Sequence, residues 1–131
     1  MCRRNLIVLL TSLILALSFS FGAFAEQQTG WVSRDGNWYY YSASGVQAKN
    51  QWLKSGEDLF WMQEDGSMAT NAWLERDEQW YYMGASGAAV SGWQEINGKY
   101  YFFSKTTYVM APNVTIDSWY VGSDGAWDPS K

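Results

Sequence analysis

A tryptophan recurs along this 131-residue chain at nearly constant spacing. Trp31, Trp52, Trp73 and Trp93 lie 21, 21 and 20 residues apart. Seven residues after each of them comes a triplet of large apolar or aromatic side chains, at 38–40, 59–61, 80–82 and 100–102. A glycine follows the first three tryptophans by fourteen residues, and Thr107 stands at the fourth such position. Such a period predicts stacked copies of one small unit, each too small to bury a core alone.

Each copy also carries a signal for a β-hairpin. Between the leading tryptophan and the triplet lie the pairs Asp35-Gly36, Gly56-Glu57, Asp77-Glu78 and Asn97-Gly98. Asp-Gly and Asn-Gly favour two-residue hairpin turns, because both central residues need positive φ. Asp77-Glu78 suits such a turn poorly and is compatible with a longer loop. The pattern predicts one antiparallel hairpin per copy.

Centring the first turn on residues 35–36 sets the register of that hairpin. Trp31 then lies opposite Tyr40, and Ser33 lies opposite Trp38. Because side chains alternate between the two faces of a strand, Trp31, Trp38 and Tyr40 share one face and Tyr39 lies on the other. The core is expected at the middle positions of the triplets: Tyr39, Phe60, Tyr81 and Tyr101. The fold class is therefore all-β, a solenoid of stacked β-hairpins from repeats of 20–21 residues or a small meander.

The first 25 residues have the three parts of a secretory signal peptide. Residues 1–4 are basic, residues 6–17 are apolar, and Ala23-Phe24-Ala25 is a small-x-small cleavage signal. An uncleaved membrane anchor is the alternative. We expect a signal peptide over 1–25 and a repeat domain over 26–131. Within that domain, four repeats run from about 30 to 111 and a partial fifth runs over 112–127.

Composition excludes several kinds of function. The chain has no His, which excludes Ser-His-Asp and Cys-His catalysis and the usual zinc sets built on imidazole. A net charge of −4 argues against a nucleic-acid surface, which needs basic residues to neutralise phosphates. The 13 Asp and Glu show no motif that would single out a catalytic pair. We therefore expect a non-catalytic module without a cofactor or a metal.

The nine Trp and nine Tyr leave three chemical interpretations of the aromatic face. Two aromatic walls closed by a third ring would attract a quaternary ammonium, at about 0.5–2 kcal/mol per cation–π contact. The same rings could stack on the apolar face of a sugar. They could also simply fill the core of the solenoid. The residues alone leave these three readings open.

Residues 29–127 resemble the cell-wall-binding repeats of the choline-binding type. The resemblance is carried above all by residues 91–102, SGWQEINGKYYF, and by the segments 66–70 and 120–127. Related repeats include those of glucan-binding glucosyltransferases and the carbohydrate-binding repeats of clostridial toxins. The family implies ligand sites between consecutive hairpins, with two aromatics from one repeat and another from the next.

Carried onto this chain, the resemblance implies four sites. Their residues are Trp31, Trp38 and Trp61 in the first; Trp52 and Tyr82, with Leu59 in place of an aromatic wall, in the second; Trp73, Trp80 and Phe102 in the third; Trp93, Tyr100 and Tyr120 in the fourth. The second site is expected to be weak or absent. Tryptophan at both wall positions of copies one and three favours choline over sugar.

The resemblance also implies a partner and a location. The expected ligand is choline on a teichoic acid-type wall polymer, with a glucan or other glycan as the alternative, and several weak sites on one rigid solenoid would gain avidity on a repeating polymer. The protein would be secreted and associated with the cell surface or wall. We expect no nucleic acid partner and no membrane contact after signal cleavage, while the oligomeric state stays open. A wall-lytic enzyme or an adhesin finds no support in particular residues.

Overall fold

Among residues 27–131, ten short strands pair two by two into five antiparallel hairpins. The computed structural model describes residues 27–131, and the predicted signal peptide lies outside that range. The strands are β1 (Gly30–Arg34), β2 (Asn37–Tyr41), β3 (Gln51–Ser55), β4 (Asp58–Met62), β5 (Ala72–Arg76), β6 (Gln79–Met83), β7 (Gly92–Ile96), β8 (Lys99–Phe103), β9 (Val114–Ile116) and β10 (Trp119–Val121). Each strand pairs only with its neighbour in sequence, so the hairpins form five separate two-stranded sheets. We number the hairpins 1 to 5 in chain order.

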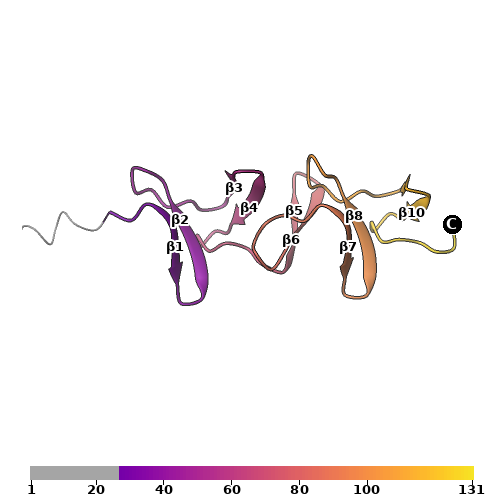
Figure 1. The fold of residues 1–131 in the computed structure, drawn as a ribbon, viewed down its shortest axis with the longest axis horizontal. Coiled ribbons are helices and arrows are strands. Elements are labelled where there is room, and N and C mark those ends of the chain that lie inside the picture. Colours follow the sequence, from indigo (N-terminus) through magenta and orange to yellow (C-terminus); the bar gives the residue numbers. More distant parts are fainter. Residues whose placement is uncertain (1–26) are drawn as a thin grey trace, which may run out of the picture.

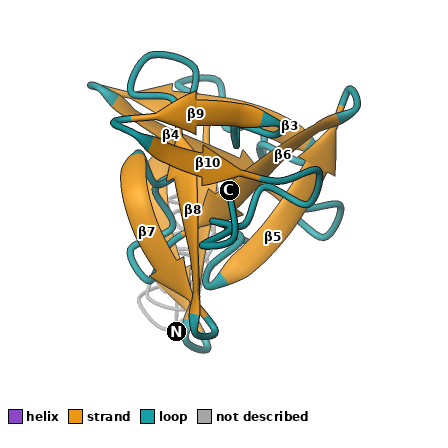
Figure 2. Cartoon of the chain, turned by 90° about the vertical axis from the view of Figure 1, so that its right-hand side faces the viewer, coloured by secondary structure: helices purple, strands orange, loops and turns teal. Residues whose placement is uncertain are grey.

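The hairpins follow one another along the long axis of the molecule (Figure 1). Hairpins 1 and 4 point the same way in that view, and hairpins 2 and 5 lie on the same side when the molecule is seen along its axis (Figure 2). Hairpins three repeats apart are thus aligned. The predicted solenoid of stacked hairpins is confirmed, and the meander is excluded because no ladder joins one hairpin to the next.

The predicted register of hairpin 1 is confirmed. Trp31 pairs with Tyr40, and Ser33 pairs with Trp38. The same register recurs in hairpins 2 to 4, where Trp52 pairs with Trp61, Trp73 with Tyr82, and Trp93 with Phe102. Two-residue turns therefore place each leading tryptophan directly opposite the last residue of its own triplet.

The turn at Asp77-Glu78 has two residues, so the longer loop considered from the sequence is wrong. Arg76 pairs with Gln79 across it, and both turn residues take positive φ, 53° at Asp77 and 63° at Glu78. Register fixed by the aromatic pairs of the hairpin overrides the local preference of a glutamate. Glu78 thus occupies a conformation that favours glycine.

Replacing Glu78 by glycine should stabilise the protein. Positive φ costs an L-residue about 1–2 kcal/mol, while glycine costs about 0.4–1 kcal/mol through the entropy of the unfolded chain. We expect a gain of up to about 1 kcal/mol in the free energy of unfolding from denaturant titration. Gly98→Ala is the matched control, since its φ is 80° and an added Cβ would meet no atom within 4 Å. Gly98→Ala should lower the free energy of unfolding. A change of this free energy in the same direction for Glu78→Gly and Gly98→Ala would contradict this account.

Hydrogen bonds from the loops that follow hairpins 2 to 5 join each repeat to the one before it. The backbone N–H of Met68 donates to the carbonyl of Trp38 in the preceding hairpin, at 2.8 Å. The bond recurs along the solenoid, from Ala89 to Leu59, from Met110 to Trp80 and from Trp127 to Tyr100, at 2.8, 2.8 and 2.7 Å. Each acceptor is the first residue of a triplet. The loop of one repeat is therefore fixed beside the first triplet residue of the repeat before it.

Hairpin 5 is shorter than the others but keeps the same relation to its loop. Val121 bridges Trp127, as Met62 bridges Met68 in hairpin 2. Counting back from this bridge makes Trp119 the counterpart of Phe60 in hairpin 2. Thr115, which pairs with Tyr120, stands where the other hairpins have their leading tryptophan. The partial fifth copy thus forms a hairpin without a leading tryptophan.

The completely buried side chains lie at the last position of the second strand. Those with the largest volume are Phe103, Met62, Met83 and Val121. Small or flexible loop residues such as Ala48, Ala69, Ala89 and Met68 are buried with them. The predicted core residues Tyr39, Phe60, Tyr81 and Tyr101 are only partly buried. The fully buried position thus lies two residues after the predicted one. The reason is that the returning loops close the interior, and these loops reach the end of each hairpin.

Among residues 27–131 there is no helix long and apolar enough to cross a membrane. The same residues contain no group of three or more His, Cys, Asp or Glu side chains arranged to hold a metal ion.

Candidate aromatic ligand sites

Within each of hairpins 1 to 4, the leading tryptophan packs edge-on against the residue opposite it. The ring centroids of Trp31 and Tyr40 are 5.3 Å apart, with the planes at 69°. The equivalent pairs Trp52–Trp61, Trp73–Tyr82 and Trp93–Phe102 have centroids 5.1, 5.4 and 5.4 Å apart. This edge-to-face geometry is the favoured one for aromatic pairs. The third triplet residue therefore braces the tryptophan of its own hairpin.

Contact with the preceding hairpin comes from the middle of the triplet instead. Phe60 packs on Trp31 with centroids 5.2 Å apart. Tyr81 packs on Trp52, and Tyr101 on Trp73, both at 4.8 Å. Neighbouring strand residues face opposite ways, so a ring that braces its own tryptophan cannot also reach back to the previous one. We call Phe60, Tyr81, Tyr101 and their counterpart Trp119 the closing residues.

The structure thus differs from the sequence-based grouping by one residue in each repeat. It puts Phe60 where Trp61 was expected, and Tyr81 where Tyr82 was expected. In the third and fourth sites, Tyr101 and Trp119 stand in place of Phe102 and Tyr120.

Trp61 lies on the other face of its strand. It is 6% exposed, and the guanidinium of Arg76 lies 4.1 Å above the centre of its ring. Arg76 also donates to the side-chain oxygen of Asn50 at 3.1 Å. The structure therefore gives Trp61 a cation from the chain itself.

A hollow of about 290 Å³ lies between hairpins 1 and 2. It is lined by Trp31, Trp38, Phe60, Met68 and Ser86. Trp31 and Trp38 come from hairpin 1, and the next repeat contributes the closing residue Phe60 and the loop residue Met68. The predicted walls of the first site are brought together here, with Phe60 as the third ring.

A second hollow of about 230 Å³, between hairpins 4 and 5, is lined by four aromatic side chains. These are Trp93, Tyr100, Trp119 and Trp127. Trp127 lies 5.2 Å from Trp119 and 6.2 Å from Tyr100, centroid to centroid, and is edge-on to both. Trp127 is the counterpart of Met68 in the first hollow, since both make the bridge that ends the loop.

Sequence reasoning missed Trp119 and Trp127. The sequence-based grouping took Tyr120, one residue after Trp119, as the closing residue, and it gave Trp127, at the end of the partial fifth repeat, no place in a site. The available signal was the six-residue interval from the buried end of a hairpin to the bridging loop residue, which is the same for Met62 to Met68 and for Val121 to Trp127.

The third site has its walls in place. Trp73 and Trp80 have centroids 6.2 Å apart at an interplanar angle of 79°, and Tyr101 closes the group. Phe102, predicted for this site, packs on Trp93 instead. The loop bond from Met110 to the carbonyl of Trp80 brings the same kind of loop residue here as in the first hollow.

At the predicted second site, the side chain of Tyr108 packs beside the residues expected to bind the ligand. Leu59 stands at the wall position, and Tyr108 packs with Trp52, Leu59 and Tyr81 against one buried cluster. The Tyr108 hydroxyl donates to the backbone carbonyl of Glu57, 51 residues away in sequence, at 2.7 Å. Tyr108 takes positive φ, 64°, in a loop one residue longer than its counterpart in the preceding repeat. Tyr82 faces Trp73 rather than this site.

The hollows are electrically neutral at their lining. Neither the four rings of the fourth site nor the five residues of the first include a charged side chain. A carboxylate stands beside the fourth site, where Tyr100 donates its hydroxyl hydrogen to Glu95 Oε2 at 3.3 Å. Such a lining offers π faces and no strong hydrogen-bonding groups, which suits a soft organic cation.

Two family descriptions match this chain. A model of the choline-binding repeat matches residues 47–89, and a model of the putative cell wall binding repeat matches residues 29–46 and 91–106. No curated protein sequence gives a significant match.

Similar solved structures come from Streptococcus pneumoniae. Choline binding protein F is 31% identical with a TM-score of 0.68, over 77% of this chain and 34% of that chain. A structure of the same protein in the presence of a peptidoglycan analogue gives 31%, 0.68, 77% and 33%. The modular autolysin LytC is 29% identical with a TM-score of 0.68, over 76% of this chain and 23% of its own. The chain thus spans about a third or less of these proteins.

Fold and site together define a repeat module of stacked hairpins with aromatic hollows between consecutive repeats. The two family descriptions together cover more than half of the chain, in agreement with the repeats found in the sequence. The chain belongs to the family of choline-binding-type cell-wall-binding repeats.

Proposed function

We propose that this protein attaches to the bacterial cell wall by binding choline on teichoic acid-type polymers in aromatic cages between consecutive hairpins. The observation that carries the proposal is the hollow between hairpins 4 and 5, at the fourth site, whose lining consists of four aromatic side chains. A trimethylammonium group donates no N–H hydrogen bond and is stabilised by π faces. Membership of the choline-binding repeat family supports the same ligand.

A glycan in the same cages is the second candidate. Aromatic rings can stack on a sugar, but a buried sugar also needs hydrogen-bonding partners for its hydroxyl groups. The lining of the hollow between hairpins 4 and 5 offers only the indole N–H groups and one phenol. This favours choline over a sugar inside the cages.

The cages are proposed at sites one, three and four. Their rings are Trp31, Trp38 and Phe60; Trp73, Trp80 and Tyr101; Trp93, Tyr100, Trp119 and Trp127. Site two is proposed to be filled by Tyr108 and to take no ligand. Four residues expected from the sequence do not contact choline in this account. Trp61, Tyr82 and Phe102 pack against the leading tryptophans of their own hairpins, and Tyr120 pairs with Thr115.

Several weak cages on one solenoid suit a repeating polymer. Sites linked at fixed spacing can gain roughly 10²–10⁴ in avidity over a single site. We propose that the protein is a secreted, wall-associated module without catalytic activity of its own. Purified cell wall incubated with the protein should then release no soluble fragments.

Titration with choline while tryptophan fluorescence is followed tests the ligand. We expect a saturable change at roughly millimolar choline, because a few cation–π contacts of about 0.5–2 kcal/mol each amount to the roughly 4 kcal/mol of a millimolar Kd. The control is 3,3-dimethylbutan-1-ol, which has the shape of choline without its charge. Loss of cation–π stabilisation should weaken its binding at least about tenfold. No saturable change at tens of millimolar choline, together with retention on a glucan column, would favour the sugar.

Tyr108→Phe should destabilise the protein by about 0.5–1 kcal/mol without changing the number of choline sites. The change removes only the hydroxyl that donates to Glu57, and a net hydrogen bond contributes about 0.5–1.5 kcal/mol, less at an exposed carbonyl. Urea unfolding measures the stability, and choline binding at saturation counts the sites. Tyr41→Phe is the control for losing an exposed tyrosine hydroxyl, which accepts from Arg34 within its own hairpin. A gain in choline stoichiometry would contradict a merely supporting role for the hydroxyl.

A further inference from the structure

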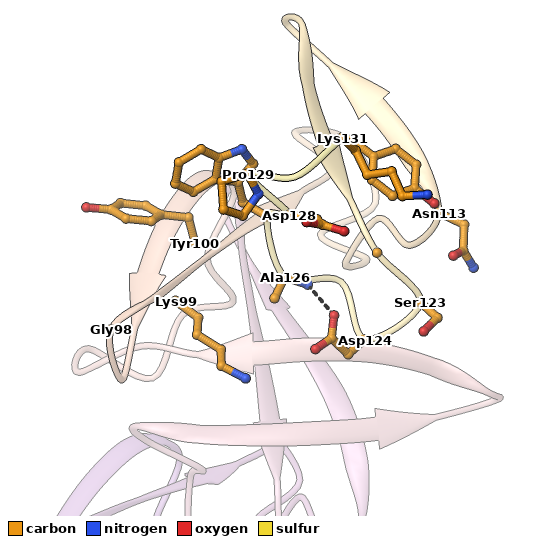
Figure 3. Close-up of a pocket in the computed structure, with 13 residues that line it drawn as sticks. Gly98, Lys99, Tyr100, Asn113, Ser123, Asp124, Ala126, Asp128, Pro129 and Lys131 are labelled. Atoms are coloured by element: carbon orange, nitrogen blue, oxygen red, sulfur yellow. Dashed lines mark hydrogen bonds between the residues drawn. The ribbon is translucent and has the colours of Figure 1, made fainter.

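A third hollow, of about 740 Å³, lies at hairpin 5 and has a different chemistry from the cages (Figure 3). The turn and first residues of the second strand of hairpin 4, Gly98 to Tyr100, form one side of it. Residues that follow β10 form the other side, among them Ser123, Asp124 and Asp128. It is open to solvent and lies next to the fourth cage.

Two aromatic side chains are shared by this hollow and the fourth cage. Tyr100 and Trp127 line both. The backbone N–H of Trp127 donates to the carbonyl of Tyr100 at 2.7 Å, which fixes the two residues relative to each other. A ligand bound in the cage would therefore have its remaining part beside this hollow, and the two rings offer a wall to both.

Polar side chains make up much of the remaining lining. Lys99 can donate, Asn113 and Ser123 can donate and accept, and Asp124 and Asp128 can accept. Asp124 Oδ1 accepts the backbone N–H of Ala126 at 2.9 Å, a bond drawn in Figure 3. Asp128 Oδ1 accepts from both the N–H and the hydroxyl of Ser130. Each carboxylate is held in place through one oxygen, which leaves Oδ2 outside these bonds.

The charges of the lining fit a neutral ligand better than an ion. Ser130 lowers the pKa of the Asp128 carboxyl through its hydrogen bonds, so this acceptor stays ionised at neutral pH. Two carboxylates, Asp124 and Asp128, and two ammonium groups, those of Lys99 and Lys131, line the hollow, so its charged side chains balance and favour neither a phosphate nor a metal cation. Mixed donors and acceptors next to aromatic rings suit a molecule with many hydroxyl groups and apolar ring faces.

We propose that this hollow binds a neutral saccharide unit of the polymer whose choline occupies the fourth cage. The inference rests on the proposed function, because it places the sugar beside the shared rings Tyr100 and Trp127. Hairpin 5 would then hold two adjacent chemical parts of one ligand. This gives the last repeat a selectivity for the polymer that choline alone cannot supply.

Nuclear magnetic resonance of the ¹⁵N-labelled full chain tests the proposal, with chitotriose and maltotriose as neutral probes. We expect at least one of them to shift the indole signal of Trp127 and the amides of Lys99, Asp124 and Asp128. The indole signal of Trp31 should not shift.

The triple variant Lys99→Ala, Asn113→Gly, Ser123→Ala should lower saccharide affinity at least about tenfold and leave choline binding unchanged. Glycine at 113 keeps the positive φ of 52° that this position requires.

Trp119→Ala separates the two proposals, since Trp119 lines the cage and not the polar hollow. It should weaken choline at the fourth site and spare the saccharide. Absence of any shift with both sugars up to about 50 mM overturns the inference. Shifts at the indoles of all four leading tryptophans would overturn it too, because the sugar would then occupy the cages. Saccharide shifts at the hollow without any choline binding would retain the hollow as a sugar site and refute the choline cages.

Discussion

The variant Trp38→Ala, Trp80→Ala, Tyr100→Ala should lose retention on a choline matrix while it stays folded. These three residues form the exposed walls of the proposed cages, being 45%, 39% and 44% exposed. Each of the three substitutions removes a cation–π contact of about 0.5–2 kcal/mol. Losing all three sites also removes the avidity of roughly 10²–10⁴ that linked sites provide. Chromatography on immobilised choline measures the loss, and binding to purified cell wall should fall in parallel.

Thermal unfolding and a matched substitution complete this experiment. None of the three side chains is at the fully buried end of a hairpin, so the melting temperature of the triple variant should fall less than that of a variant truncated at such a position. Val46→Ala, at the most exposed of the large hydrophobic side chains, should change neither. Full retention of the folded triple variant would refute the wall positions. The single variants should each lose part of the affinity, in contrast to Val46→Ala.

The fold could be predicted from the sequence because its information is local. A turn pair such as Asp35-Gly36 fixes a hairpin, and the turn fixes the register that puts Trp31 opposite Tyr40. The repetition of this unit then predicts that the hairpins stack. Even the unfavourable pair Asp77-Glu78 follows the repeat, because the register of Trp73 and Tyr82 leaves room for only two turn residues.

Grouping of the rings across repeats could not be predicted in the same way. The choice between Phe60 and Trp61 depends on which strand face meets the previous hairpin. That face is set by bonds between repeats, such as the one from Met68 N–H to the Trp38 carbonyl, at a separation of 30 residues. No local pattern encodes them. Trp61 also looked available in the sequence, although Arg76 covers its ring in the structure.

The fifth hairpin is two residues shorter between its turn and its buried end than the other four. Its turn, Asp117-Ser118, is followed at once by Trp119, so counting from the turn misplaces every later residue. Its buried end at Val121 is the feature that keeps the repeat register. Repeats whose hairpins vary in length are therefore better aligned on their buried ends than on their turns.

Phe103→Ala should cause the largest loss of stability of any change considered for this chain. Phe103 is completely buried, and its ring lies 5.7 Å from that of Trp73, centroid to centroid. Truncating such a phenylalanine costs about 3–5 kcal/mol through lost burial and the cavity that remains. Urea unfolding of the variant should show a loss of that size, or a separate early transition.

The position of Phe103 in hairpin 4 also predicts which hairpins unfold first in the variant. In a solenoid each repeat is stabilised by its neighbours, so a defect in hairpin 4 should propagate to hairpin 5 and leave hairpins 1 and 2 in place. The fluorescence response to choline should then lose the contribution of the fourth cage before that of the first. Met62→Ala, at the equivalent buried position of hairpin 2, should reverse the order. Simultaneous loss of both cages in the two variants would show that the five hairpins unfold as a single unit.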